Sequence, residues 1–161
     1  MQTGPILPPP GAGNDWHDAH VRRLLDAFTR ATGRDLAKEL GASADLGRFF
    51  HDGDFALLSH RGDADATLNY GNARALALWE CGWEDFTAMP SRQTAPRPDR
   101  AERETMMTQV AQKGFVEGYS GERISRGGRR FMIRDGIVWR LQDADGASFG
   151  VAAFVPRFDY L

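Results

Sequence analysis

The chain has 161 residues and a mass of 17.9 kDa, which suits one domain with a sizeable core and leaves too little for two ordinary domains. Hydrophobic residues make up 42% and charged residues 26%, so disordered, collagen-like and membrane-spanning classes are disfavoured. The formal charge of -2 gives no overall field that would attract a polyphosphate, so nucleic acid is not an expected partner.

The cysteine content and the N-terminus favour a cytoplasmic protein. Cys81 is the single cysteine, so no intrachain disulfide can form and a reducing compartment fits best. No stretch approaches the ~20 apolar residues of a membrane span. The N-terminus also lacks the basic start and apolar run of a secretory signal.

The first 41 residues predict an arm followed by two helices. Residues 1–13 combine prolines with glycines, which predicts a flexible N-terminal arm. The helical segment is expected over 14–41. Within it, residues 15–32 place apolar side chains at helical spacing with charged ones outside, and Gly33 can end that amphipathic helix. A shorter helix is expected over 35–40.

The middle of the chain predicts two strands and then short helices. Residues 55–60 form an apolar run typical of a buried strand, and residues 67–70 form the returning strand. Asn72 can cap a helix that finishes at Gly82. Another brief helical piece follows over 83–89.

The last part of the chain predicts one helix and an antiparallel meander. After a proline-rich loop over 90–98, residues 101–113 form a helix with its methionines on one side. Three β-type runs follow over 115–126, 129–142 and 148–155. The expected fold is therefore α+β, with five antiparallel strands, helices packed on one face and an added N-terminal amphipathic helix.

A two-residue loop at Gly127–Gly128 would set the register of the first hairpin. Glu122 would then face Ile133 on the core side of the sheet. Strand alternation also predicts that one face carries the apolar side chains of the second run, which are Phe131, Ile133, Ile137, Trp139 and Leu141.

Several short motifs resemble the MEKHLA domain family, whose fold is PAS-like. Each motif is weak alone, but their order and spacing over residues 49–156 make the resemblance specific. In chain order they are Leu58–His60, Asn69–Asn72, Pro90–Arg92, Gly118–Gly121, Arg123–Ser125, Gly128–Phe131 and Val138–Trp139. The resemblance implies a PAS-like sensory or interaction module over 49–156, similar to the bacterial members that lack an attached output domain. No established reaction or cofactor comes with it.

The resemblance also implies a small-molecule site between the sheet and its covering helices. An apolar cavity with a few polar groups is the usual geometry of such a site. The expected ligand-binding residues are Trp79, Met106, Val110, Glu122, Phe131, Ile133, Trp139 and Phe154. The alternative is that these side chains simply fill the core.

Other interpretations of single residues stay open. Arg134 and Arg140, together with Arg123 or Arg92, would suit an anion, or they are surface arginines of a strand face. The helix over 15–32 is the expected packing element of a homodimer.

An enzyme with a cone-shaped sheet is the competing class. It would use Glu122 or a histidine such as His51 as its base. Known catalytic motifs are incomplete, and we predict no catalytic residue. His17 and His20 with Asp18 do not complete a zinc site, so no metal site is predicted either.

Overall fold

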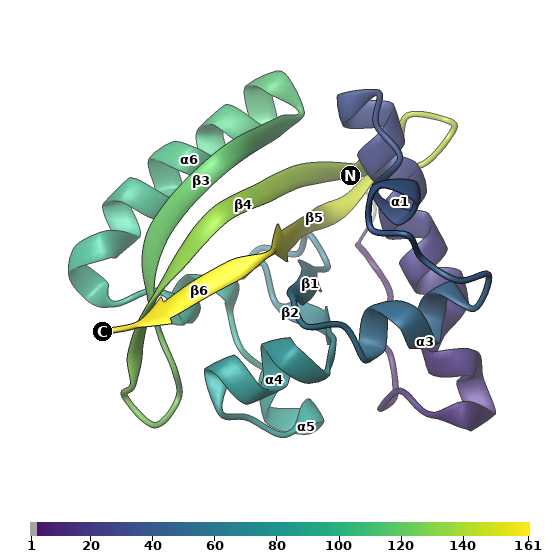
Figure 1. The fold of residues 1–161 in the computed structure, drawn as a ribbon. Coiled ribbons are helices and arrows are strands. Elements are labelled where there is room, and N and C mark those ends of the chain that lie inside the picture. The colour runs from purple at the N-terminus through teal and green to yellow at the C-terminus, as the bar shows by residue number, and fades with distance from the viewer. Residues whose placement is uncertain (1–2) are drawn as a thin grey trace.

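One antiparallel sheet of six strands crosses the molecule (Figure 1). The structure is a computed structural model that describes residues 3–161; Met1 and Gln2, the start of the expected arm, lie outside the described residues. The strands are β1 (Ala56–His60), β2 (Leu68–Gly71), β3 (Phe115–Ile124), β4 (Arg130–Gln142), β5 (Ser148–Val155) and β6 (Arg157–Tyr160). Their order is β2-β1-β5-β4-β3, and β6 pairs with β4 beyond the end of β5.

Helices precede the sheet and also connect its second and third strands. The α-helices are α1 (Asp18–Thr32), α2 (Leu36–Glu39), α3 (Leu46–His51), α4 (Ala73–Trp79), α5 (Trp83–Phe86) and α6 (Arg100–Lys113). Short 3-10 helices are η1 (Ala12–His17), η2 (Ser91–Thr94) and η3 (Arg97–Asp99). The α+β prediction is confirmed, while β6 and α3 were not predicted. No helix within residues 3–161 has both the length and the apolar character needed to cross a bilayer.

The two faces of the sheet carry separate cores. Side chains from α4 and α6 pack on one face, which is the arrangement expected for the covering helices. The N-terminal helix α1 packs on the other face. Figure 1 shows α6 alongside β3, and α1 at the opposite end of the sheet. Because β1, β4 and β5 supply side chains to both cores, the two layers share one framework.

Helix α1 buries its apolar side within the chain. Leu24 and Phe28 are completely buried, and the Phe28 ring meets Trp139 edge-on with ring centres 5.0 Å apart. The Trp139 indole Nε1 donates a hydrogen bond to the Leu24 carbonyl oxygen at 3.0 Å. The apolar side of α1 therefore already has a partner, and the predicted homodimer through this helix, which stays a prediction, would have to use its polar side.

Residues 4–7, which belong to the flexible arm expected over 1–13, contact the rest of the domain. The Gly4 amide donates to the Arg61 carbonyl at 2.6 Å. Further along, the Trp83 indole donates to the Leu7 carbonyl at 3.0 Å. Proline-rich backbone cannot pair regularly, but its carbonyl groups remain free to accept hydrogen bonds from side chains.

The inner face of β4 changes partway along the strand, which corrects the expectation of one continuous apolar face. Phe131 and Ile133 belong to the core under α6, whereas Trp139 belongs to the core under α1. Asp135 has a left-handed backbone (φ 55°), and the β3–β4 register shifts between Tyr119 and Gly121. Such a bulge adds one residue and reverses the alternation of side chains beyond it.

The hairpin between β3 and β4 is also shifted by one residue from the expected register. The Ser125 amide donates to the Arg129 carbonyl, so the loop is longer than two residues. Glu122 therefore pairs with Met132, and Arg123 pairs with Phe131. A shift of one residue exchanges the two faces of a strand, so Arg123 points inward and Glu122 outward.

Candidate ligand-binding cavity

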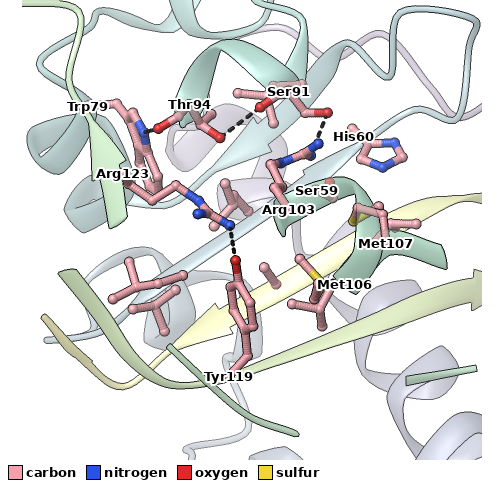
Figure 2. A pocket seen from close by; sticks show the side chains of 17 residues that line it. Ser59, His60, Trp79, Ser91, Thr94, Arg103, Met106, Met107, Tyr119 and Arg123 are labelled. Atoms are coloured by element: carbon pink, nitrogen blue, oxygen red, sulfur yellow. Dashed lines mark hydrogen bonds between the residues drawn. The ribbon is translucent and has the colours of Figure 1, made fainter. Parts of the chain in front are cut away.

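A cavity of about 60 Å³ lies between α6, η2 and the sheet. Every strand from β1 to β5 contributes at least one lining residue. Its apolar lining includes Leu58, Leu68, Trp79, Met106, Ile133, Val138 and Val155. Its polar lining includes His60, Ser91, Thr94, Arg103, Tyr119 and Arg123, and Figure 2 shows these side chains around one space.

Arg123 reaches the cavity from β3 and is only 5% exposed. One guanidinium nitrogen donates to the Tyr119 hydroxyl oxygen at 3.0 Å, and the other terminal nitrogen donates to the Glu122 carbonyl oxygen at 2.9 Å. The Tyr119 hydroxyl in turn donates to the Glu102 carboxylate at 3.0 Å. Burial raises the pKa of Tyr119, so its hydroxyl stays protonated. Within residues 3–161, Arg123 has no carboxylate at ion-pair distance.

Arg103 reaches the same space from α6 and is 7% exposed. It donates to the Ser91 hydroxyl at 2.9 Å and contacts the Glu104 carboxylate at 3.2 Å. That carboxylate is 67% exposed, so solvent screens it. Burial, and then the nearby charge of Arg123, lower the pKa of Arg103. Two guanidinium groups therefore share a largely buried region.

His60, the last residue of β1, lines the cavity, and its ring carries a buried hydrogen-bond donor that has no partner within the described residues. Its Nδ1 accepts the Gly62 amide at 3.2 Å, which places the ring proton of the neutral form on Nε2. Nε2 is buried and has no hydrogen-bond partner within the described residues. Burial, together with the charge of Arg103, lowers the pKa of His60 to about 4, so the ring is neutral at pH 7.

A second cavity of about 250 Å³ adjoins the first beneath α6. His60, Met107 and Val151 line both cavities and therefore stand between them. Methionine side chains change rotamer readily and fit irregular spaces. Met107 is consequently the most adaptable part of this partition.

Several residues predicted from the sequence do line the first cavity, namely Trp79, Met106 and Ile133. Val110 lines the second cavity. Phe131 is fully buried in the same core and meets the Trp79 ring edge-on at 5.2 Å between ring centres.

The remaining predicted residues lie elsewhere. Trp139 and Phe154 are on the opposite face of the sheet, in the core under α1, because of the bulge in β4 and the alternation along β5. Glu122 is on the outer side of β3 and forms an ion pair with Arg130 at 2.7 Å. Glu122 therefore does not lie in a closed pocket, as the enzyme interpretation required of its base. The His51 ring lies against the Trp16 ring, tilted by 35° with ring centres 4.8 Å apart, and is likewise not part of the cavity.

Of the arginines that the sequence suggested for an anion, only Arg123 is in the cavity. Arg134 forms an exposed ion pair with Asp159, and Arg92 forms one with Asp65. Arg140 donates to a carbonyl oxygen at the end of α6.

The sequence did not predict Arg103, His60 or Tyr119 as site residues, although His60 and Tyr119 lie within the family motifs Leu58–His60 and Gly118–Gly121. A signal for Arg103 exists, because it shares the spacing of Met106 and Val110 and so lies on the inner side of α6. An arginine on an apolar helix face is unusual enough to mark a site. The orphan donor on His60 depends on a turn geometry that composition does not reveal.

On the other face, a buried hydrogen-bond network connects the N-terminal segment to α1. The Ser59 hydroxyl donates a hydrogen bond to Asn69 Oδ1 at 2.6 Å, so it accepts one from the Nε2–H of His20 at 3.1 Å. The Asn69 amide donates to the Pro5 carbonyl at 2.9 Å. Burial lowers the pKa of His20 to about 3, and Arg23 and His17 add to that effect. No group of three or more metal-ligating side chains gathers anywhere in residues 3–161.

The arrangement of sheet and covering helices is shared with solved PAS domains. The PAS domain of a protein from Colwellia psychrerythraea has a TM-score of 0.60 at 12% identity, over 79% of this chain and 98% of that one. A PAS domain from a two-component sensor histidine kinase has a TM-score of 0.55 at 15% identity, over 71% and 91%. The PAS domain of a LuxR-family transcriptional regulator from Burkholderia thailandensis, solved with ethanol, has a TM-score of 0.50 at 20% identity, over 71% and 95%. The fold is therefore that of a PAS domain.

The family follows from the sequence match. A model of the MEKHLA domain matches residues 18–160. The chain therefore belongs to the MEKHLA domain family, as its motifs predicted, and the match includes both α1 and β6. A search of curated proteins finds no match to this chain.

Proposed function

We propose that this chain is a sensory module that binds a small molecule in the cavity between α6, η2 and the sheet. The observation that carries the proposal is the cavity itself, which combines an apolar lining with the unpartnered Nε2–H of His60. Buried polar groups normally have hydrogen-bond partners, so an orphan donor in a cavity suits a bound acceptor. The related fold from Burkholderia thailandensis was solved with ethanol, which supports a small occupant for this type of domain.

Binding would act on α6 and on the segment before it. Arg103, Met106 and Met107 belong to α6, and Ser91 and Thr94 belong to η2. These elements cover the sheet through few contacts with other helices. A ligand that contacts them better in one arrangement than in another shifts the population toward that arrangement. We therefore place the sensory output at α6.

The test begins with protein purified without harsh treatment. Native mass spectrometry should find a retained compound of low mass, or a thermal-shift screen of small polar and amphipathic molecules should find one that raises the melting temperature. Binding to the native state stabilises it by mass action. Retention of nothing and stabilisation by nothing would contradict the proposal.

A cavity-filling variant locates the binding site. Ala153 lines the cavity from β5, so Ala153→Leu should occupy part of the space and abolish the ligand-induced shift. Ala101→Leu, on the exposed side of α6, adds the same atoms outside the cavity and should keep the shift. An unchanged shift in Ala153→Leu would place the ligand elsewhere.

A further inference from the structure

The charges around the cavity leave its two buried guanidinium groups poorly compensated. Each guanidinium offers five N–H donors, but Arg103 and Arg123 each direct contacts to only two partners within the described residues. The two nearby carboxylates, Glu102 and Glu104, are both exposed. Glu104 contacts Arg103 directly, whereas Glu102 is connected to Arg123 only through the Tyr119 hydroxyl. Buried charges are costly unless they are paired, so the site favours an added anion.

Three donors from three different elements surround this space. Arg103 comes from α6, Arg123 from β3 and His60 from β1, and Figure 2 shows all three side chains around the same cavity. Arginine forks match the geometry of a carboxylate, and the Nε2–H of His60 is a further donor with no acceptor. An acidic group would satisfy donors that the protein alone leaves unused.

The rest of the lining limits the other end of the ligand. Leu58, Ile133, Val138 and Val155 present only hydrocarbon to the cavity. This lining disfavours an ion that is polar on all sides, such as inorganic phosphate, because the hydrocarbon side of the cavity offers no donors to its remaining oxygens. A cavity of about 150 Å³ takes benzene, so a volume of about 60 Å³ takes roughly two to three non-hydrogen atoms. The rest of a longer tail would extend past Met107 into the adjoining cavity of about 250 Å³.

We infer that the ligand is a short aliphatic monocarboxylate, of the size of acetate to butyrate, whose carboxylate is held by Arg103, Arg123 and the Nε2–H of His60. This inference rests on the proposed function and names its ligand class. The hydrocarbon tail lies against the β4 and β5 side chains. Met107, between the two cavities, sets the longest chain that fits.

The experiment compares matched ligands by isothermal titration calorimetry on the full chain at pH 7. Acetate, propionate and butyrate are the test ligands. Propionamide is the neutral analogue of propionate and tests the need for a charge. Inorganic phosphate is an anion without an apolar tail and tests the need for that tail. Propionate or butyrate should bind, while propionamide and phosphate should bind at least about tenfold more weakly, the loss expected for a charge-assisted hydrogen bond or an unsatisfied buried group.

Arginine variants identify the groups that hold the carboxylate. Arg123→Gln and Arg103→Gln should each weaken propionate binding roughly 10- to 100-fold, which is the effect of losing a hydrogen bond to a charged group. Arg134→Gln is the matched control, because Arg134 lies on β4 in an exposed ion pair with Asp159. It should bind propionate as the unmodified chain does.

A measurement on the unmodified protein keeps the inference testable if an arginine variant does not fold. In ¹⁵N spectra of the histidine side chains, saturating propionate should shift the His60 Nε2–H signal, and propionamide should not reproduce that shift. Equal binding of propionate and propionamide, or a silent His60, would overturn the carboxylate assignment while leaving the proposed function intact. If no ligand of any class binds, the proposed function fails with it.

Discussion

Two buried histidines, His20 and His60, make the stability of the domain sensitive to acid. Each is neutral in the folded chain, with pKa values lowered from 6.5 to about 3 and about 4, chiefly by burial. Protonation would place a second ring proton on His20 Nδ1, which has no acceptor, or on His60 Nδ1, which already accepts the Gly62 amide. The unfolded chain has neither restriction, so it takes up protons first.

We expect the free energy of unfolding to fall as the pH is lowered from 6.5 to 4.5. In this window the unfolded chain binds protons that the native state excludes, and stability then rises with pH. One pKa unit is worth 1.36 kcal/mol, so each histidine contributes roughly 2–3 kcal/mol of the change. Urea unfolding at several pH values measures it.

Variants assign this acid sensitivity to the two histidines. His20→Gln and His60→Gln should each reduce the pH dependence in that window by about half, since the two shifts are of similar size. The double variant should lose most of the dependence between pH 6.5 and 4.5, and the remainder belongs to His51, whose pKa is also lowered by burial. A steep profile in the double variant would contradict this explanation.

At the scale of elements, α1 packs on the sheet and shares a core with it. Phe28 is fully buried against Trp139, and the indole of Trp139 is bonded to the backbone of α1. Removing a large aromatic side chain from such a site loses its transfer free energy and leaves a void. The docked helix is therefore expected to contribute strongly to stability.

Phe28→Ala should lower the free energy of unfolding by about 3–5 kcal/mol, measured by urea titration. Asp26→Ala, on the exposed side of the same helix, should change it by less than about 0.5 kcal/mol. The alternative is that α1 forms a dimer interface, which sedimentation velocity would detect. If Phe28→Ala dissociated a dimer and left stability unchanged, α1 would be an assembly element.

Most elements of this fold could be predicted from the sequence, because their signals are local. Spacing and end residues gave α1 and α6 within a few residues, and the Asn72 side chain does cap α4 by accepting the Ala75 amide at 3.0 Å. The strand β6 was missed because it is short, mostly exposed and follows Pro156, so it lacks an alternating apolar pattern.

The cavity was harder to predict than the fold because it depends on register. The alternation rule is reliable only along an unbroken strand, and the bulge at Asp135 moved Trp139 to the other face relative to Ile133. Phe154 of β5 pairs with Ile137, beyond that bulge, and lies on the same face as Trp139. The hairpin loop shifted the pairing by one residue, which exchanged Glu122 with Arg123. Neither the left-handed residue nor the loop length has a strong sequence signal.

At the scale of the whole molecule, both helical layers should unfold together. Neighbouring residues of β1 and β4 enter opposite cores, as Leu57 and Leu58 do, and also Val138 and Trp139. Loss of one layer would therefore expose the back of the strands that support the other. Small single domains usually unfold in one cooperative transition.

Two tryptophan variants test this cooperativity. Trp79 reports on the core under α6 and Trp139 on the core under α1. Within each variant, Trp79→Phe or Trp139→Phe, fluorescence and far-ultraviolet circular dichroism should report the same urea midpoint. Separate midpoints for the two probes within one variant would show that the N-terminal helices and the rest of the chain are independent units.

The position of β1 has a consequence for the proposed ligand binding. Ser59 joins the network that holds His20 of α1, while the next residue, His60, belongs to the cavity. A solute that fixes the His60 ring thus acts on the same peptide unit that anchors the N-terminal helix. Thermodynamic reciprocity requires any such influence to be equal in both directions, so a partner that pulls α1 away would release the solute by the same free energy.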